Sequence, residues 1–178
     1  DRPIRAAWPQ LASLVALADL PDSLAPRAAN AAFLLGDPAA ATSLGWIASD
    51  ATAPIDRRLF ALTALAQWNE PFGRDRITGL WRDLPPRSSA RGGRETAGKI
   101  LPALLQDADA AIRLAAAESA GTLKLTGLAD NLLAVASVEK ETGEIRAAAL
   151  QALAAMDSPK LGAGVKVALQ TKDRTLLE

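Results

Sequence analysis

One short pattern recurs along this 178-residue chain and constrains its fold more than any other feature. Arg113 heads the run Leu-Ala-Ala-Ala, and Arg146, 33 residues later, heads a closely similar run. Arg27 and Arg58 head two earlier copies, which lie 31 residues apart. The interval from Arg58 to Arg113 is 55 residues, which equals one 33-residue period plus an insertion of about 22 residues. A repeat of this length indicates a stack of similar supersecondary units.

The composition of the chain and the spacing of its apolar residues predict that each repeat is a pair of helices. The chain has 40 alanines and 28 leucines, against 12 valines and isoleucines together and no tyrosine. Strong helix formers therefore dominate and strand formers are scarce. Apolar residues in each copy recur at intervals of three and four, as Leu59, Leu62 and Leu65 do. A turn rich in Asp, Pro or Gly precedes each copy, and a second apolar segment precedes the turn.

These patterns predict an all-α protein folded as a right-handed α-α superhelix, a solenoid of about four and a half helix pairs in a single domain over residues 1–178. The predicted helices span residues 5–19, 23–35, 39–49, 55–68, 75–83, 90–106, 109–122, 127–138, 143–156 and 159–170. The predicted repeats cover residues 5–36, 38–69, 90–123 and 126–156, with a partial repeat at 158–178 and an irregular insertion at 70–91. We expect Trp46 and Trp68 to pack inside this structure.

The last predicted helix pair lacks its second helix, and no polar capping repeat follows it. We therefore expect the chain to be a piece of a larger protein. The uncapped apolar faces at 5–19 and 159–170 predict weak self-association.

Missing residue types exclude several kinds of chemistry. The chain contains no histidine and no cysteine, which excludes Ser-His and Cys-His catalysis, thiol redox chemistry and zinc fingers within it. Acidic residues near one another, such as Asp107 and Asp109, lie at turns between helices, where carboxylates cap free N–H groups. No apolar run reaches the length of about 20 residues that spans a bilayer. We therefore predict a non-catalytic segment with no cofactor, no metal and no membrane span.

The insertion and its flank concentrate positive charge in a chain whose 20 basic and 20 acidic residues balance. Seven basic and three acidic residues give residues 74–99 a charge of +4. The candidate partner-binding residues are Arg74, Arg76, Trp81, Arg82, Arg87, Arg91 and Arg94. They suit an acidic protein surface, for which Arg and Trp are common anchors, or a nucleic-acid backbone. A third interpretation is that Trp81 packs onto the helices while the arginines are solvated or pair locally.

Two of the repeats resemble a known family. The residues are Ile100-Leu-Pro-Ala-Leu-Leu105, the turn Asp107-Ala-Asp109, Ile112-Arg113-Leu-Ala-Ala-Ala117, and Glu144-Ile-Arg-Ala-Ala-Ala-Leu-Gln-Ala-Leu153. This sequence resembles the HEAT repeat, which belongs to the armadillo-like α-solenoids. In that family the turn Asp and the helix Arg form a ladder along the solenoid. The resemblance assigns this structural role to Asp109, Arg113 and Arg146.

A narrower resemblance involves the insertion. The segment Pro71-Phe-Gly-Arg-Asp-Arg-Ile-Thr-Gly-Leu-Trp-Arg-Asp-Leu-Pro-Pro-Arg87, followed by a HEAT-like pair, is similar to part of large secreted bacterial proteins. Those proteins join a sorbosone/glucose dehydrogenase-like β-propeller, a HEAT-repeat segment and a c-type cytochrome domain. The resemblance implies a secreted or periplasmic location, although the residues themselves leave a cytoplasmic one open. It also implies that this chain is a spacer or docking module that holds flanking domains of its parent protein or another protein.

The alternative function is that of a nucleic-acid-binding HEAT-like module that uses the basic insertion. The zero net charge argues against this alternative.

Overall fold

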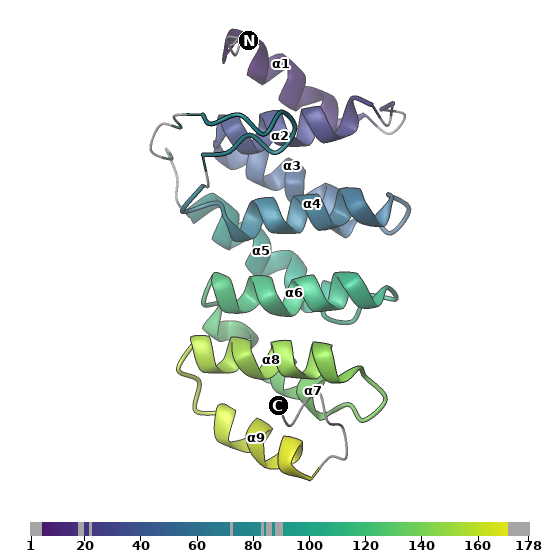
Figure 1. Cartoon of the computed structure of the whole chain (residues 1–178), viewed down its shortest axis with the longest axis vertical. Helices are drawn as coiled ribbons and strands as arrows, with labels where there is room; N and C mark the ends of the chain where they lie inside the picture. The colour runs from purple at the N-terminus through teal and green to yellow at the C-terminus, as the bar shows by residue number, and fades with distance from the viewer. Residues whose placement is uncertain are drawn as a thin grey trace. The chain divides into compact units, whose positions relative to one another are not determined.

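The computed structural model of the chain describes residues 5–17, 20–21, 23–71, 73–82, 84, 87 and 91–170. These residues form nine α-helices and three short 3-10 helices, which confirms the all-α prediction for the described part of the chain (Figure 1). The elements are η1 (Arg5–Ala7), α1 (Trp8–Ser13), η2 (Leu14–Ala16), α2 (Ala25–Leu35), α3 (Pro38–Ser49), α4 (Ile55–Ala66), α5 (Arg91–Leu104), α6 (Ala110–Thr122), η3 (Thr126–Leu128), α7 (Ala129–Ser137), α8 (Gly143–Ala155) and α9 (Leu161–Leu169). None of the described helices combines the length and the apolar character that crossing a bilayer requires.

Side-chain caps fix where three of the helices begin. The Asp37 carboxylate accepts a hydrogen bond from the Ala40 amide at 2.7 Å, and Pro38 occupies the first turn of α3. The Asp109 carboxylate accepts from the amides of Ala111 and Ile112 at the start of α6. The Thr142 hydroxyl does the same for α8 by accepting from Ile145. These caps satisfy N–H groups that the first turn of a helix leaves without partners.

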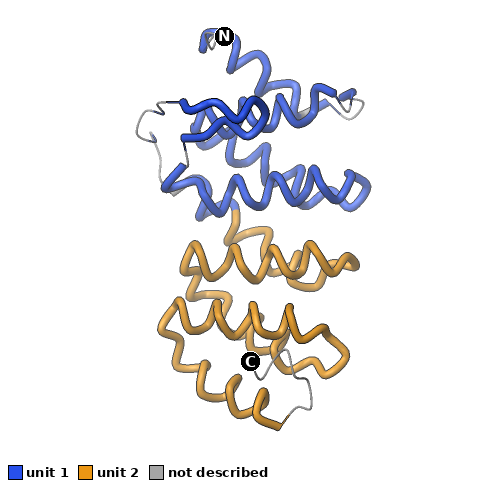
Figure 2. The backbone as a smooth tube through the Cα atoms, in the orientation of Figure 1, with its two compact units in different colours: residues 1–96 blue, residues 97–178 orange. Residues whose placement is uncertain are grey.

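The chain divides into two compact units, residues 1–96 and residues 97–178 (Figure 2). In unit 1, α1 packs on α2, α3 packs on α4, and α2 also contacts both α3 and α4. In unit 2, α6 lies beside α8, and α7 contacts α8 and α9. Helix α5 begins in unit 1 and ends in unit 2.

Small side chains allow close packing inside each unit. In unit 1, a Cβ atom on Gly93 would lie 2.3 Å from Cβ of the fully buried Trp68. In unit 2, a Cβ atom on Gly121 would lie 2.9 Å from Cα of Ala152. Glycine is therefore needed at these two positions, while buried alanines, leucines and a few larger side chains fill the rest of the interior.

Two of the arginines that head the repeats make the same buried hydrogen bond. Arg58 is 2% exposed, and its Nε donates to the carbonyl of Ala48 at 3.0 Å. Arg146 is also 2% exposed, and its Nε donates to the carbonyl of Ala136 at 2.9 Å. Each acceptor lies ten residues upstream, in the last turn of the preceding helix. The bond therefore satisfies a carbonyl that the end of a helix leaves free, and it ties the two helices of a pair together.

The structure corrects the sequence predictions in two segments. Residues 75–83 are predicted as a helix, but those of them that the structure describes form turns and an isolated bridge, with Gly79 at a φ of +70°. The side chain of Asp75 turns the chain back by accepting hydrogen bonds from the amides of Ile77 and Thr78. The single helix predicted over 5–19 is divided into η1, α1 and η2, and it ends at Ala16.

Candidate functional site

The insertion folds into a small hairpin in unit 1. Arg74 and Trp81 form an isolated antiparallel bridge. The Asp75 amide donates to the Leu80 carbonyl at 2.8 Å, and the Arg82 amide donates to the Gly73 carbonyl at 2.6 Å. The hairpin therefore has a defined backbone conformation although it contains no helix.

The carboxylate of Asp75 organises the inside of this hairpin. Asp75 is 6% exposed, and its oxygens accept from the Ile77 and Thr78 amides at 2.9 and 2.8 Å. Burial is the largest single effect on its pKa and raises it. Hydrogen bonds from the Thr78 and Ile77 amides, the Thr78 hydroxyl and Arg82 together outweigh burial, so that the pKa of Asp75 lies below its usual value. The ionised carboxylate also meets Arg82 Nε and Asn30 Nδ2, each at 3.4 Å, and Asn30 belongs to α2.

Two further arginines of the insertion pack on aromatic rings of the helices. The guanidinium carbon of Arg76 lies 4.8 Å from the ring centre of Phe33 and 5.4 Å from that of Phe60. That of Arg87 lies 4.6 Å from the ring centre of Phe33 and 4.4 Å from that of Trp68. These distances are within the range of cation–π attraction.

Arg87 is also bound to the backbone of α2 and of the residues after α4. Its Nε donates to the Trp68 carbonyl at 3.0 Å, and its Nη1 donates to the Phe33 carbonyl. Partial burial lowers the pKa of Arg76, and it lowers that of Arg87 to about 10. Both side chains therefore carry a positive charge at neutral pH while they fasten the insertion to the helices.

The structure divides the seven candidate partner-binding residues into different roles. Arg76, Arg82 and Arg87 hold the insertion in place through the contacts above. Trp81 is 71% exposed, and its neighbour Leu80 is 46% exposed. The remaining three arginines lie nearby in the sequence. Arg74 is exposed, and its Nε donates a hydrogen bond to the Gly79 carbonyl at 2.9 Å. Arg91 is the first residue of α5, and Arg94 is exposed on the same helix.

The residues of the proposed ladder lie in unit 2 and make different bonds. The Asp109 carboxylate caps α6. Arg113 forms a bidentate ion pair with Glu141, with Nε–Oε2 at 2.6 Å and Nη2–Oε1 at 2.9 Å. Its Nη1 donates to the carbonyls of Asp107 and Ala108. Arg146 makes the buried carbonyl bond described above. Glu141 is the residue that sequence reasoning did not connect with Arg113, because the two are 28 positions apart.

Acidification is expected to weaken unit 2 through this ion pair. The hydrogen bond from Arg113 is the largest effect on the pKa of Glu141 and lowers it, against the opposing effect of burial. A carboxylate with a lowered pKa in the folded state stabilises the protein above its unfolded-state pKa of about 4.3, and this stabilisation is lost as pH falls through the folded-state pKa. Below about pH 4.3 the unfolding free energy of the parent is expected to fall as pH falls. That of the Glu141→Gln variant is expected to fall less, because the variant lacks this carboxylate. Urea denaturation of both proteins at pH 7 and at pH 3 measures this, and equal pH dependence would contradict it.

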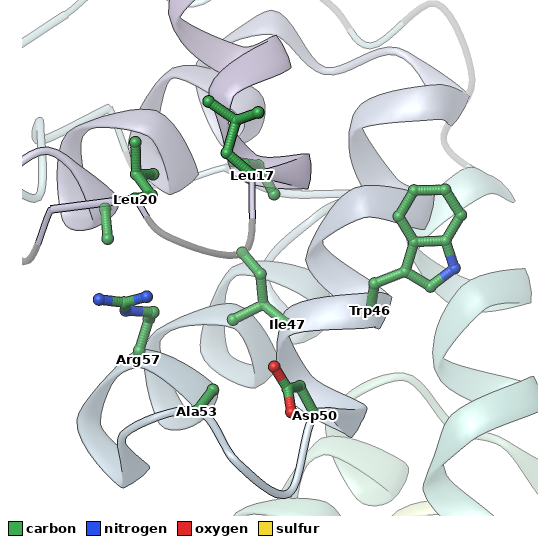
Figure 3. A pocket seen from close by; sticks show the side chains of 9 residues that line it. Leu17, Leu20, Trp46, Ile47, Asp50, Ala53 and Arg57 are labelled. Carbon is green, nitrogen blue, oxygen red and sulfur yellow. The ribbon is translucent and has the colours of Figure 1, made fainter.

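A groove in unit 1 is lined in part by Trp46, which is exposed like Trp81 (Figure 3). It has a volume of about 320 Å³ and is lined by Val15, Leu17, Leu20, Ala25, Trp46, Ile47, Asp50, Ala53 and Arg57. Figure 3 shows Ile47 in the middle of the labelled side chains, with Leu17 on one side and Asp50 on the other. Trp68 is fully buried as predicted, but Trp46 is 64% exposed, so the prediction that it packs inside is wrong.

Comparisons of the chain with known protein families, with curated proteins and with solved structures give no match. Among the described residues, no three acidic side chains come together as a metal site would require.

Proposed function

We propose that this chain is a non-catalytic protein-interaction segment, built as a right-handed α-α superhelix of HEAT-like repeats. The contacts of α2 with α4 in unit 1, and of α6 with α8 in unit 2, support repeat stacking within each unit. The repeated bond from Arg58 and Arg146 to a carbonyl ten residues upstream supports a common repeat design. One observation carries the functional part of the proposal: Trp81 is 71% exposed on a hairpin that is anchored to the helices.

The anchoring makes Trp81 well suited to bind a partner. Arg87 ties the insertion to Phe33, 54 residues upstream, and Asp75 ties it to Asn30, 45 residues upstream. A hairpin held in this way loses little conformational entropy when a partner binds. Tryptophan contributes more to protein interfaces than most residues because it buries a large, rigid apolar surface. Trp81 and Leu80 together therefore form the docking tip.

The partner in this proposal is a flanking domain of a larger parent protein. The resemblance of residues 71–87 to a segment between a dehydrogenase-like β-propeller and a c-type cytochrome domain supports a spacer in a secreted or periplasmic redox protein. Redox chemistry would then belong to the flanking domains, and this chain would hold them.

Nucleic-acid binding is the weaker candidate. A phosphate backbone is bound mainly by exposed Lys and Arg side chains. Arg82 pairs with Asp75, and Arg76 and Arg87 lie on aromatic rings, so these three contribute little to an exposed basic surface.

The parent reading frame and a binding measurement test the proposal together. We expect a β-propeller sequence before residue 1 and a CxxCH motif after residue 178. Calorimetric titration of the chain with each separately produced flanking domain is expected to detect binding. Trp81→Gln is expected to weaken it about tenfold or more, because the tip loses its largest apolar contact.

Val138→Gln is the matched control, because Val138 is 49% exposed but lies in unit 2. Equal affinity of the Trp81→Gln variant and the parent would exclude the docking tip. Oxidation of glucose or sorbosone by the purified 178-residue chain alone would contradict the non-catalytic role.

A further inference from the structure

Two apolar surfaces of this chain are exposed, and each has a charged side chain beside it. The first is the groove of Figure 3, with Leu17 56% exposed and Trp46 64% exposed at its sides. The second is the outer side of α9, where Val165 is 42% exposed and Leu169 is 72% exposed. Large apolar side chains that gather at one surface usually mark an interaction site.

The groove supplies the concave member of the pair. Val15, Leu17 and Leu20 from the N-terminal segment line it together with Ile47 of α3. Asp50 follows directly after α3 and is exposed at the edge. Its Oδ1 accepts from the Thr52 amide at 2.9 Å and from the Thr52 hydroxyl at 2.7 Å. These bonds stabilise the ionised carboxylate, so the groove carries a negative charge at this edge. Arg57 also lines the groove, next to the exposed Asp56.

Helix α9 supplies the convex member. Val165 and Leu169 are four residues apart and therefore lie one above the other on one side of the helix. Gly162 and Ala163 are also exposed, and their small side chains allow another surface to approach the helix closely. The only charged residue of α9 is Lys166, which is exposed and lies in the last turn. An apolar ridge beside one positive charge matches an apolar groove with a carboxylate at its edge.

From this match we infer that the occupant of the groove is a second copy of this chain, which inserts Val165 and Leu169 of its α9 beside Trp46 and Ile47. Lys166 of the inserted helix then meets the negative edge at Asp50. The zero net charge of the chain means that two copies approach without overall electrostatic repulsion. The contact joins different surfaces of the two copies, so it is a head-to-tail contact, which closes into a ring or continues from copy to copy.

The size of the inserted element predicts weak association. Helix α9 has nine residues and is about 14 Å long, which buries less surface than a stable dimer requires. We expect a dissociation constant on the order of 100 µM. This inference is independent of the proposed function, since neither surface includes the insertion.

Sedimentation equilibrium between about 10 and 500 µM tests the inference, since this range brackets the expected constant. The weight-average mass of the parent chain is expected to rise above the monomer mass of 18.5 kDa as concentration increases. Trp46→Gln and Leu169→Gln each remove one of the two surfaces, and each is expected to weaken association at least fivefold. Both side chains are mostly exposed, so these substitutions leave the core intact, which far-ultraviolet circular dichroism verifies.

Mixing the two variants gives the decisive measurement. The Trp46→Gln copy keeps its α9, and the Leu169→Gln copy keeps its groove. An equimolar mixture is therefore expected to recover dimers but no larger species. Val138→Gln, at an exposed valine outside both surfaces, is the matched control and is expected to associate like the parent. A parent chain that stays monomeric over the whole range, a mixture that does not recover dimers, or an equal loss in the control would each overturn the inference.

Discussion

Replacing Gly93 by alanine is expected to lower the free energy of unfolding of this protein by about 3 kcal/mol. Gly93 is buried in the first turn of α5, and a Cβ atom there would lie 2.3 Å from Cβ and 2.4 Å from Cγ of Trp68. These Trp68 atoms are at the base of a fully buried side chain that also packs on Phe33 and Arg87. The tryptophan cannot rotate away, so the backbone of α5 has to shift. Urea denaturation followed by circular dichroism measures the loss.

The adjacent glycine provides a matched control for this substitution. A Cβ atom on Gly92 would meet its nearest neighbours, Pro38 and Ala41, at 3.5 and 3.6 Å, which are ordinary contact distances. Gly92→Ala is therefore expected to change the unfolding free energy by less than about 1 kcal/mol, because alanine also favours the helix. If both variants lost the same stability, the contact with Trp68 would not be the cause.

Removing either of the buried repeat arginines is the second large effect that we expect. Arg146→Ala and Arg58→Ala are each expected to cost about 3 kcal/mol of unfolding free energy. Each substitution removes the packing of a long side chain and leaves the carbonyl of Ala136 or Ala48 without this donor. The same urea denaturation measures both variants.

Two other variants separate the causes of this loss. Arg146→Lys keeps the charge and most of the aliphatic chain but has no donor at the Nε position, so it is expected to lose about half as much stability. Arg27→Ala removes a repeat arginine that is exposed and donates its Nη1 to the carbonyl of Ser23, and it is expected to cost less than about 1 kcal/mol. A loss in Arg146→Ala no larger than that in Arg27→Ala would show that the buried carbonyl bond contributes little.

The helices of this protein could be predicted from its sequence because their signals are local. Apolar residues at intervals of three and four predict starts for α3 and α6 that lie within one residue of the observed ones, and Asp109 caps α6 as its position at a turn predicts. The recurrence of Arg58 and Arg146 at equivalent places also singled out two residues that prove to be buried. They share a bond to a carbonyl ten residues upstream, whereas Arg113, at the equivalent place in another copy, pairs with Glu141.

The insertion and the groove could not be predicted because they depend on contacts between distant residues. Arg76 and Arg87 look like exposed charges in the sequence, and only the folded chain brings them onto Phe33 and Trp68. A helix is predicted over 75–83, but the carboxylate of Asp75 binds the amides of Ile77 and Thr78 and favours a turn. Trp46 has the same local pattern as a buried residue, and nothing in its sequence neighbours indicates that it faces solvent.

The number of residues that each of these hydrogen bonds spans predicts the order in which unit 1 folds. The bond between Arg58 and Ala48 closes a loop of ten residues, so it forms as soon as α3 and α4 meet. The bond between Arg87 and Phe33 closes 54 residues, which costs more chain entropy. The rings of Phe33 and Trp68, on which Arg87 packs, must also be in place before this bond stabilises the fold. We therefore expect the helix pairs of unit 1 to form first and the insertion to dock on them last, so that the proposed docking tip takes its final place only after the helices that anchor it have formed.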